Sequence, residues 1–181
     1  ASAAPGQVGT ASIPTATVQS SQRKVFFDSV NKRHWAFFFN GSKIKYRSSS
    51  DGVTWSGTSS LDYDTPNFSV MHKVIADQSH VLLAVENNHD IIVRHGIITN
   101  TTISFSTTVT AFDGTAIDDS YKKPSISIDS NNRVWVAAVM TDDAELYDNA
   151  RIFTRRSVGT LGSALDTWEA PFRIGRKNGL I

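Results

Sequence analysis

The sequence contains no cysteine among its 181 residues. Disulfide bonds, thiolate nucleophiles and cysteine-ligated zinc sites are therefore excluded. Long hydrophobic runs are missing as well. Apolar stretches such as residues 35–39 have only the length of a β-strand, whereas a membrane-spanning helix needs about 18 or more apolar residues. The sequence therefore predicts no transmembrane helix.

An excess of charge of one sign is also lacking. The formal net charge is +1 at pH 7, and the densest group of basic residues is only Arg151, Arg155 and Arg156. A protein that binds nucleic acid or an anionic membrane through its charge needs a larger basic surface. The composition therefore argues against a nucleic-acid partner, and the length suits one sizeable hydrophobic core.

No segment shows the sustained apolar spacing of an amphipathic helix. Apolar residues recur at every second position instead, for example at Ile44 and Tyr46 and at Ile91 and Val93. This alternation is typical of β-strands, and the many Ser, Thr, Asn and Asp residues suit the turns between them. The sequence predicts an all-β protein.

Three segments align with one another, beginning at Val25, Val74 and Ser125. Each has a short strand that ends in aspartate, a second, strongly apolar strand, a third strand that ends in arginine, and a turn followed by an aromatic residue. The recurring residues are Asp28, Asp77 and Asp129; Arg47, Arg94 and Arg155; and Trp55, Phe105 and Trp168. A period of about 50 residues with four short strands is typical of propeller blades. We expect units at 21–62, 63–115 and 116–181, after a linker or entering strand over residues 1–20.

The first of these turns, residues 44–55, reads IKYRSSSDGVTW. Asp51-Gly52 between two strand-like runs is a strong hairpin signal. Gly52 accepts a positive φ, and the Asp51 carboxylate can accept hydrogen bonds from N–H groups just downstream. We expect Ser49, Asp51 and Gly52 to be structural, and Trp55 to be a buried anchor whose indole N–H finds a partner.

This turn resembles an Asp-box, the bacterial neuraminidase repeat at the blade edges of sialidase-like β-propellers. The second repeat lacks the aspartate, whereas the third keeps a serine, a glycine and Trp168 but inserts residues. The resemblance implies a partial β-propeller of Asp-box type with three four-stranded blades. The alternative is another antiparallel β-sandwich.

Three blades do not close a ring, because propellers use about four to eight blades. An open arc of three blades would leave apolar faces and strand edges uncovered. We therefore expect either further blades in a longer polypeptide or self-association, for instance of two arcs about a two-fold axis.

Sialidases hold the substrate carboxylate with three arginines. Arg47, Arg94 and Arg155 recur at one position per repeat, which makes them candidate ligand-binding residues for an anion. The alternative is a repeated structural role in which each arginine bonds turn carbonyls. In sialidases the first substrate arginine belongs to an Arg-Ile-Pro motif just before the first blade, and residues 12–14 here read Ser-Ile-Pro. Because serine cannot replace a bidentate cation, we assign no catalytic residue and an enzyme is disfavoured.

An acidic loop holds Asp142, Asp143 and Asp148, whose oxygen atoms are the ligands that Ca²⁺ prefers. The alternative is a plain solvated loop. Apart from this calcium candidate, we expect no cofactor.

These observations predict an extracellular or cell-surface propeller module for binding or scaffolding, with a glycan or a protein as its partner. One alternative is a sialidase-like glycoside hydrolase with an incomplete site in this chain, which needs converging arginine, tyrosine and glutamate. A lectin instead needs exposed aromatic residues flanked by amides or carboxylates. The remaining alternative, a structural subunit of a surface assembly, needs large contacts between subunits.

Overall fold

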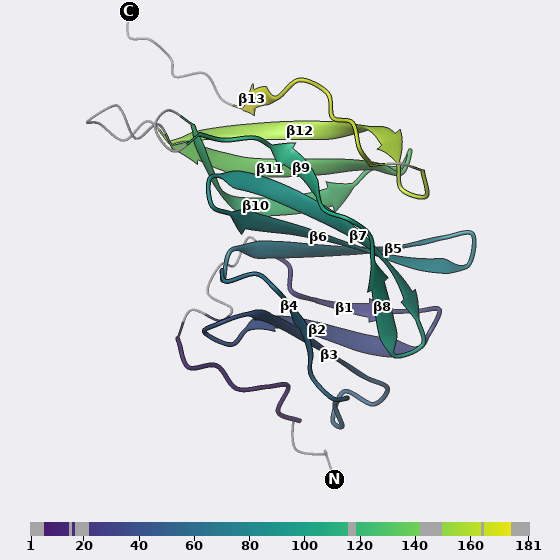
Figure 1. Cartoon of the computed structure of the whole chain (residues 1–181). Coiled ribbons are helices and arrows are strands. Elements are labelled where there is room, and N and C mark those ends of the chain that lie inside the picture. Colours follow the sequence, from purple (N-terminus) through teal and green to yellow (C-terminus); the bar gives the residue numbers. More distant parts are fainter. Residues whose placement is uncertain are drawn as a thin grey trace, which may run out of the picture.

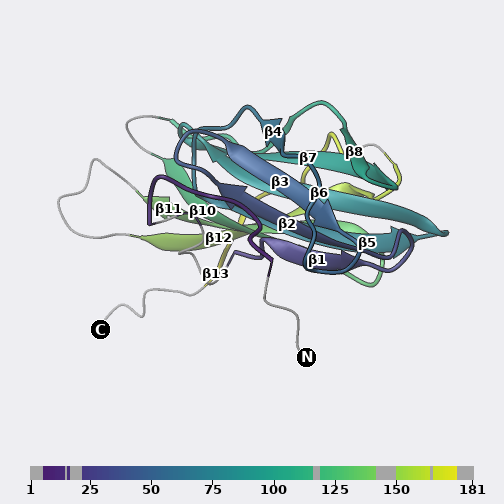
Figure 2. The same ribbon diagram turned by 90° about the horizontal axis from the view of Figure 1, so that it is seen from below.

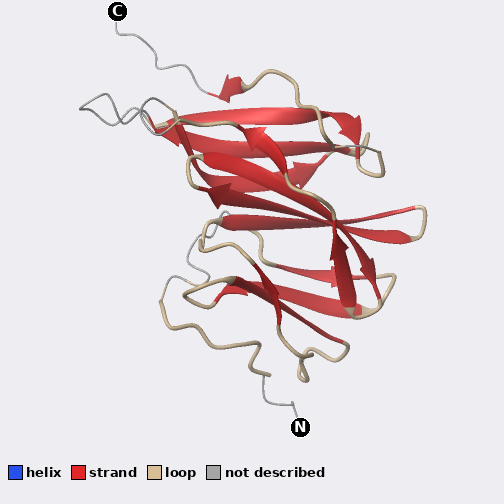
Figure 3. Ribbon diagram, viewed as in Figure 1, coloured by secondary structure: helices blue, strands red, loops and turns tan. Residues whose placement is uncertain are grey.

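The computed structural model describes residues 6–14, 16, 22–115, 119–141, 150–163 and 165–174. These residues form thirteen β-strands and no helix (Figures 1 and 3). The prediction of an all-β protein is therefore confirmed. The strands make three antiparallel sheets, named A, B and C in chain order, which lie one above the other in Figure 1.

Sheet A is formed by the first four strands, joined in sequence order. They are β1 (Val25–Asp28), β2 (Arg33–Phe39), β3 (Ile44–Ser49) and β4 (Ser59–Leu61). Figure 2, which looks at the molecule from below, shows this sheet in front of the other two. Each strand pairs with the next, as the alternating pattern and the short polar turns predict.

Sheet B has one strand more than the four expected. Its strands are β5 (Phe68–Ile75), β6 (Gln78–Asn87), β7 (Asp90–Thr99), β8 (Thr102–Phe105) and β9 (Val109–Phe112). Both β8 and β9 pair with β7, β8 along its second half and β9 along its first half. The fourth position of this sheet is thus shared by two short strands.

Sheet C repeats the order of sheet A. Its strands are β10 (Ser120–Ile128), β11 (Arg133–Thr141), β12 (Arg151–Thr160) and β13 (Phe172–Ile174). The pairing of β10 with β11 is shifted between Lys122 and Ser125, where Pro124 cannot donate to the ladder.

The expectation of a turn directly after each recurring arginine is wrong for sheets B and C. β7 continues past Arg94 to Thr99, and β12 continues past Arg155 to Thr160. In sheet B the residues after Arg94 keep the strand pattern, and Ile98 is buried against the core, so the hairpin extends. In sheet A the Asp51 turn ends the pairing soon after Arg47.

Two apolar layers lie between the sheets. The layer between sheets A and B includes Trp35, Phe37, Ile44, Val70, Leu83 and Ile92. The layer between sheets B and C includes Leu82, Ile91, Val93, Val134 and Val136. Sheet B is covered on both faces, which explains why its central strand β6 is a continuous apolar run.

The first strands of the three sheets lie close together: β10 contacts β5, and β1 contacts β5. The segment just before β1 ties them to one another. Val70 donates its N–H to the carbonyl of Arg23 at 2.8 Å, and the Gln22 side chain donates to the carbonyl of Pro124 at 3.1 Å. The sheets therefore meet along their first strands.

Candidate functional site

The turn between β3 and β4 is organised by Asp51. Its Oδ1 accepts hydrogen bonds from the N–H groups of Val53 and Thr54 at 2.8 and 2.7 Å, and from the Ser49 hydroxyl at 2.8 Å. The Ser49 hydroxyl oxygen accepts the N–H of Gly52 at 2.9 Å, and Gly52 has a φ of 72°. The bonds from Thr54, Val53 and Ser49 hold the pKa of Asp51 well below its usual value, although its side chain is exposed.

The indole of Trp55 differs from the sequence-based expectation. Trp55 is only half-buried, and its Nε1 is buried without a hydrogen-bond partner among the described residues. Nε1 of Trp35 and Nε1 of Trp168 are likewise buried without a hydrogen-bond partner among the described residues. The carbonyl of Ser48, which lies across this turn, already accepts the N–H of Ser56.

One backbone hydrogen bond recurs in all three sheets at the turn that follows the arginine strand. In each, the residue after the recurring aromatic donates its N–H to the carbonyl of the residue after the recurring arginine. The pairs are Ser56 to Ser48 at 2.8 Å, Ser106 to His95 at 2.8 Å, and Glu169 to Arg156 at 2.9 Å. The positions aligned by sequence are therefore structurally equivalent, even where the aspartate is missing.

The three recurring arginines use the same atom for the same kind of contact. Each Nε donates to the segment that follows its strand: Arg47 to the Thr58 hydroxyl at 2.6 Å, Arg94 to the Ser106 carbonyl at 3.0 Å, and Arg155 to the Glu169 carbonyl at 2.6 Å. Arg155 also reaches the carbonyl of Ala111 in sheet B at 2.7 Å. The structure thus places each arginine within its own sheet, bridging its third strand to the next segment.

The recurring aspartates do not behave alike. Asp28 and Asp129 accept N–H groups of the turns that follow them, and Asp129 also accepts the indole N–H of Trp135 at 3.1 Å. These bonds, the one from Trp135 first, lower the pKa of Asp129. Asp77 instead lies exposed in a tight hairpin turn with a φ of 61°.

A buried polar group links sheets A and B. Nε2 of His72 lies 2.7 Å from the Ser79 hydroxyl and 3.7 Å from Oδ1 of Asp28. The residue types are those of a hydrolase triad, but the geometry is not: both partners face the same imidazole nitrogen, and Ser79 and Asp28 are 1% and 0% exposed. Phe26 stacks on the His72 ring with centroids 4.7 Å apart, so this group is a packed contact between sheets.

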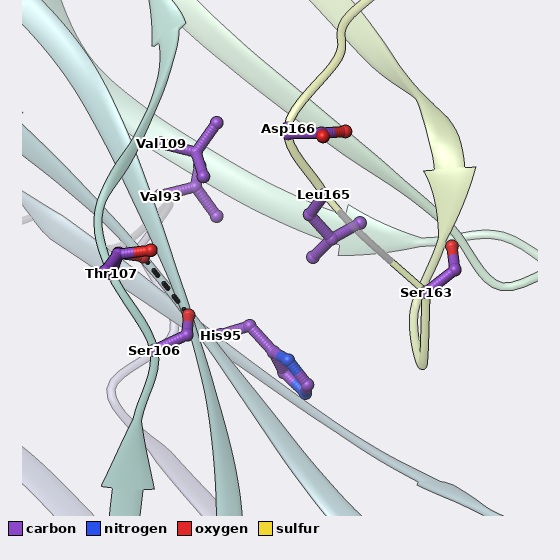
Figure 4. Close-up of a pocket in the computed structure, with 8 residues that line it drawn as sticks. All are labelled: Val93, His95, Ser106, Thr107, Val109, Ser163, Leu165 and Asp166. Atoms are coloured by element: carbon purple, nitrogen blue, oxygen red, sulfur yellow. Dashed lines mark hydrogen bonds between the residues drawn. The ribbon is translucent and has the colours of Figure 1, made fainter.

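A shallow hollow of about 230 Å³ lies between sheets B and C, beside the end of β12 (Figure 4). Val93 and His95 line it from sheet B, and Leu165 and Asp166 line it from the loop after β12. Its polar atoms are largely engaged by the protein itself. The His95 Nε2 lies 2.9 Å from His80 Nδ1, and Asp166 accepts the Thr167 hydroxyl at 3.0 Å. Little hydrogen-bonding capacity is left for a ligand.

Carboxylates at both ends of the strands accept backbone N–H groups. At the end where β1 and β3 finish, Asp28, Asp51 and Asp129 accept turn N–H groups, and at the other end Asp90 and Glu86 accept those of Gly114 and Lys123. The opposite end is here called the loop end. There, residues 62–67 connect sheet A to sheet B, and the described residues of the connection from sheet B to sheet C are 113–115 and 119. Three carboxylates of these loops accept no hydrogen bond from the described residues: Asp64, Asp113 and Asp119.

Two aromatic residues accompany these carboxylates. Tyr63 follows Asp62 and precedes Asp64, is only partly buried, and its hydroxyl lies 3.4 Å from that of Thr108. Tyr121 is 7% exposed, and burial followed by the charge of Asp119 raises its pKa. We take the loop end, defined by Tyr63, Asp64, Asp113 and Asp119, as the candidate functional site.

A buried lysine lies close to this end. Lys24 is 6% exposed, donates to the carbonyl of Pro66 at 2.6 Å, and places Nζ 3.9 Å from the centroid of the Phe68 ring. Burial lowers its pKa to about 8. Nothing in the local sequence marks this residue as special, because its burial depends on sheet B.

The calcium candidates Asp142, Asp143 and Asp148 lie outside the described residues. Within the part of the chain that the structure describes, no group of three or more His, Asp or Glu residues could hold a metal ion. The described residues also contain no helix long and apolar enough to cross a membrane. Ser12 lies at the edge of sheet A, where its N–H and its hydroxyl both reach the carbonyl of Asn40 at 3.1 Å.

No protein-family model matches the chain, and no curated protein sequence matches it. Among solved structures, the chain is similar to the crystal structure of an endo-arabinase from Bacteroides thetaiotaomicron VPI-5482. The similarity has a TM-score of 0.40 and 10% sequence identity, and covers 93% of this chain and 85% of that one.

Proposed function

We propose that sheets A, B and C are three consecutive blades of an Asp-box type β-propeller, and that the propeller is an extracellular binding module. The observation that supports this proposal is the recurring hydrogen bond of the three turns, which makes the sheets equivalent units. The meeting of the first strands supports it further, because the first strand of a propeller blade lies at the central axis. Each arginine bridges its strand to the next segment, as a repeated structural residue does.

The ligand that suits the loop end best is a glycan. Sugars present many hydroxyl groups, which carboxylate oxygens accept as hydrogen bonds, and apolar ring faces, which aromatic side chains cover. Asp64, Asp113 and Asp119 supply carboxylates that accept no hydrogen bond from the described residues, and Tyr63 supplies a partly exposed ring between two carboxylates. This is the combination expected of a lectin.

Glycan binding is tested by screening the purified chain against an array of soluble glycans and titrating each positive by calorimetry. The variant Asp64→Asn/Asp113→Asn should lose at least tenfold in affinity, because each amide lacks the negative charge and replaces one acceptor oxygen with a donor. The matched control is Asp166→Asn, an exposed aspartate at the opposite end of the strands. Equal loss in both variants, or binding by neither the natural chain nor the control, would contradict a glycan site at the loop end.

A hydrolase remains the second candidate because the same unused carboxylates are the residue type that glycosidases employ as acid and base. A glycan that binds should then be cleaved. Incubation of each positive glycan with the chain, followed by measurement of new reducing ends, separates the two functions. We expect binding without release of reducing sugar.

A further inference from the structure

Equivalent positions at the two ends of the row of sheets are buried to very different extents. In sheet A, Ile44 pairs with Leu61, and in sheet C the equivalent pair is Ile152 with Ile174. Ile44 and Leu61 are 0% and 7% exposed, because sheet B covers them, whereas Ile152 and Ile174 are both 49% exposed. Phe172, beside them on β13, is 68% exposed. The outer face of sheet C thus carries core-type residues that none of the described residues covers.

This outer face is also hollowed. A depression of about 430 Å³ is lined by Trp135, Arg156, Glu169, Phe172 and Ile174. Its charged groups are already paired: Arg156 places two nitrogens 3.0 and 2.6 Å from Oε1 of Glu169, and its guanidinium lies 5.3 Å from the centroid of the Trp135 ring. Because Arg156 and Glu169 pair with one another, an apolar partner can cover the face without burying an unpaired charge.

The outer face of sheet A shows the complementary feature. Val25 of β1 faces Ala36, as Val70 of β5 faces Leu83 in sheet B. Val70 is 0% exposed because it packs against sheet A, whereas Val25 is 63% exposed. Phe27 on the same strand is 48% exposed. The outer face of sheet A therefore has the residues that cover a preceding sheet, but no preceding sheet among the described residues.

Residues 6–14 cover only part of this face. Ser12 bonds the carbonyl of Asn40 at one end of the segment, and Gly9 lies so close to the Phe38 ring that a side chain there would overlap it. A hollow of about 240 Å³ remains between the segment and Val25 and Ala36. The segment therefore covers Phe38 and leaves Val25 open, and a docked sheet would have to displace it.

We propose that the outer face of sheet A in one copy docks head to tail on the outer face of sheet C in a second copy. The contact continues the series of interfaces already present between A and B and between B and C, and it rests on the proposal that the sheets are consecutive blades. Two copies related by a two-fold axis make this contact twice and close a ring, which removes both open faces. The interaction is with a second copy of this chain rather than with an unrelated protein.

The test uses two face variants and their mixture. Phe172→Asp places a charge on the sheet C face, and Val25→Asp places one on the sheet A face. Val30→Asp is the matched control, since Val30 is 41% exposed in the β1–β2 turn. Sedimentation equilibrium at micromolar concentration gives the mass of each, and near-ultraviolet circular dichroism checks that each variant is folded.

We expect the natural chain and Val30→Asp to sediment as dimers and each face variant to sediment as a monomer. An equimolar mixture of the two face variants should regain a dimer, because one intact sheet A face meets one intact sheet C face. A folded natural chain that is monomeric throughout would overturn the proposal. A Val25→Asp variant that dimerises as well as the natural chain would overturn it too, since the contact would then join two sheet C faces. Neither result depends on whether the loop end binds a glycan.

Discussion

Nδ1 of His80 lies 2.9 Å from Nε2 of His95, and the two rings stack with centroids 5.1 Å apart. His80 is 3% exposed, so the pair is held inside the protein. One ring must donate this hydrogen bond and the other must accept it. A pair in which both rings are protonated has two donors and no acceptor, and therefore breaks the contact.

Because three histidines are buried, we expect the protein to lose stability on mild acidification. Burial lowers the pKa of His72, His80 and His95 below the ordinary value of 6.5. A folded-state pKa below that of the unfolded chain leaves stability unchanged above pH 6.5 and reduces it as the pH falls from 6.5 through the folded-state value. Calorimetric melting temperatures should therefore be level near pH 7 and fall between about pH 6.5 and pH 5.

The variant His80→Gln tests the origin of this loss, because it removes one titrating ring and keeps a side chain that can hydrogen-bond. We expect a smaller fall in melting temperature over the same pH range. A slope identical to that of the natural chain would show that the pair is not responsible. His34, which is exposed, provides the control His34→Gln with an unchanged slope.

We expect substitution of Asp51 to lower the stability of the protein. Asp51→Ala leaves the N–H groups of Val53 and Thr54 without the acceptor that now serves both. Its melting temperature should fall, but by less than that of Trp35→Ala, which removes a fully buried indole at a cost of about 3–5 kcal/mol. Thermal melts of both variants at pH 7 give the comparison. An unchanged melting temperature in Asp51→Ala, together with loss of a binding activity, would make the turn a functional site.

We expect two similar tryptophan substitutions to lower stability to different extents, because only one of the indole nitrogens donates a hydrogen bond. Trp135→Phe removes the hydrogen bond that Trp135 gives to Asp129, whereas Trp55→Phe removes none. Both lose a similar volume. We therefore expect Trp135→Phe to lower the melting temperature more than Trp55→Phe does. Asp129→Asn is then added to each tryptophan variant in a double-mutant cycle. The effect of Trp135→Phe on the melting temperature should change when Asp129→Asn is present, whereas the effect of Trp55→Phe should stay the same.

Sialidase activity should be absent. If the chain is the Asp-box propeller proposed above, Ser12 takes the place of a substrate arginine of sialidases, and it lies exposed with its polar atoms turned to Asn40. Incubation with a fluorogenic sialoside should release no fluorophore above the level of a heat-denatured sample. Turnover that disappears in Arg47→Ala or Arg94→Ala would instead show that the recurring arginines hold a substrate carboxylate.

Much of the secondary structure could be predicted from local sequence. Alternation at Ile44 and Tyr46 marks a strand because side chains of a strand alternate between faces, whatever lies beyond them. Asp51-Gly52 marks a turn because the carboxylate and the positive φ act within a few residues. The repeat with a period of about 50 residues predicted three sheets, since it counts local units rather than contacts between them.

The tertiary structure alone decided which side chains meet. His72 and Asp28 belong to different sheets, and their contact, like the burial of Lys24, exists only because sheets A and B pack together. The same reasoning separates Ile44 from Ile152, which are the same residue type at equivalent strand positions but differ in exposure. Local chemistry determines the strand and the turn, because it acts over a few bonds. Burial depends on the surface that covers a residue, and that surface comes from a distant part of the chain or from another molecule.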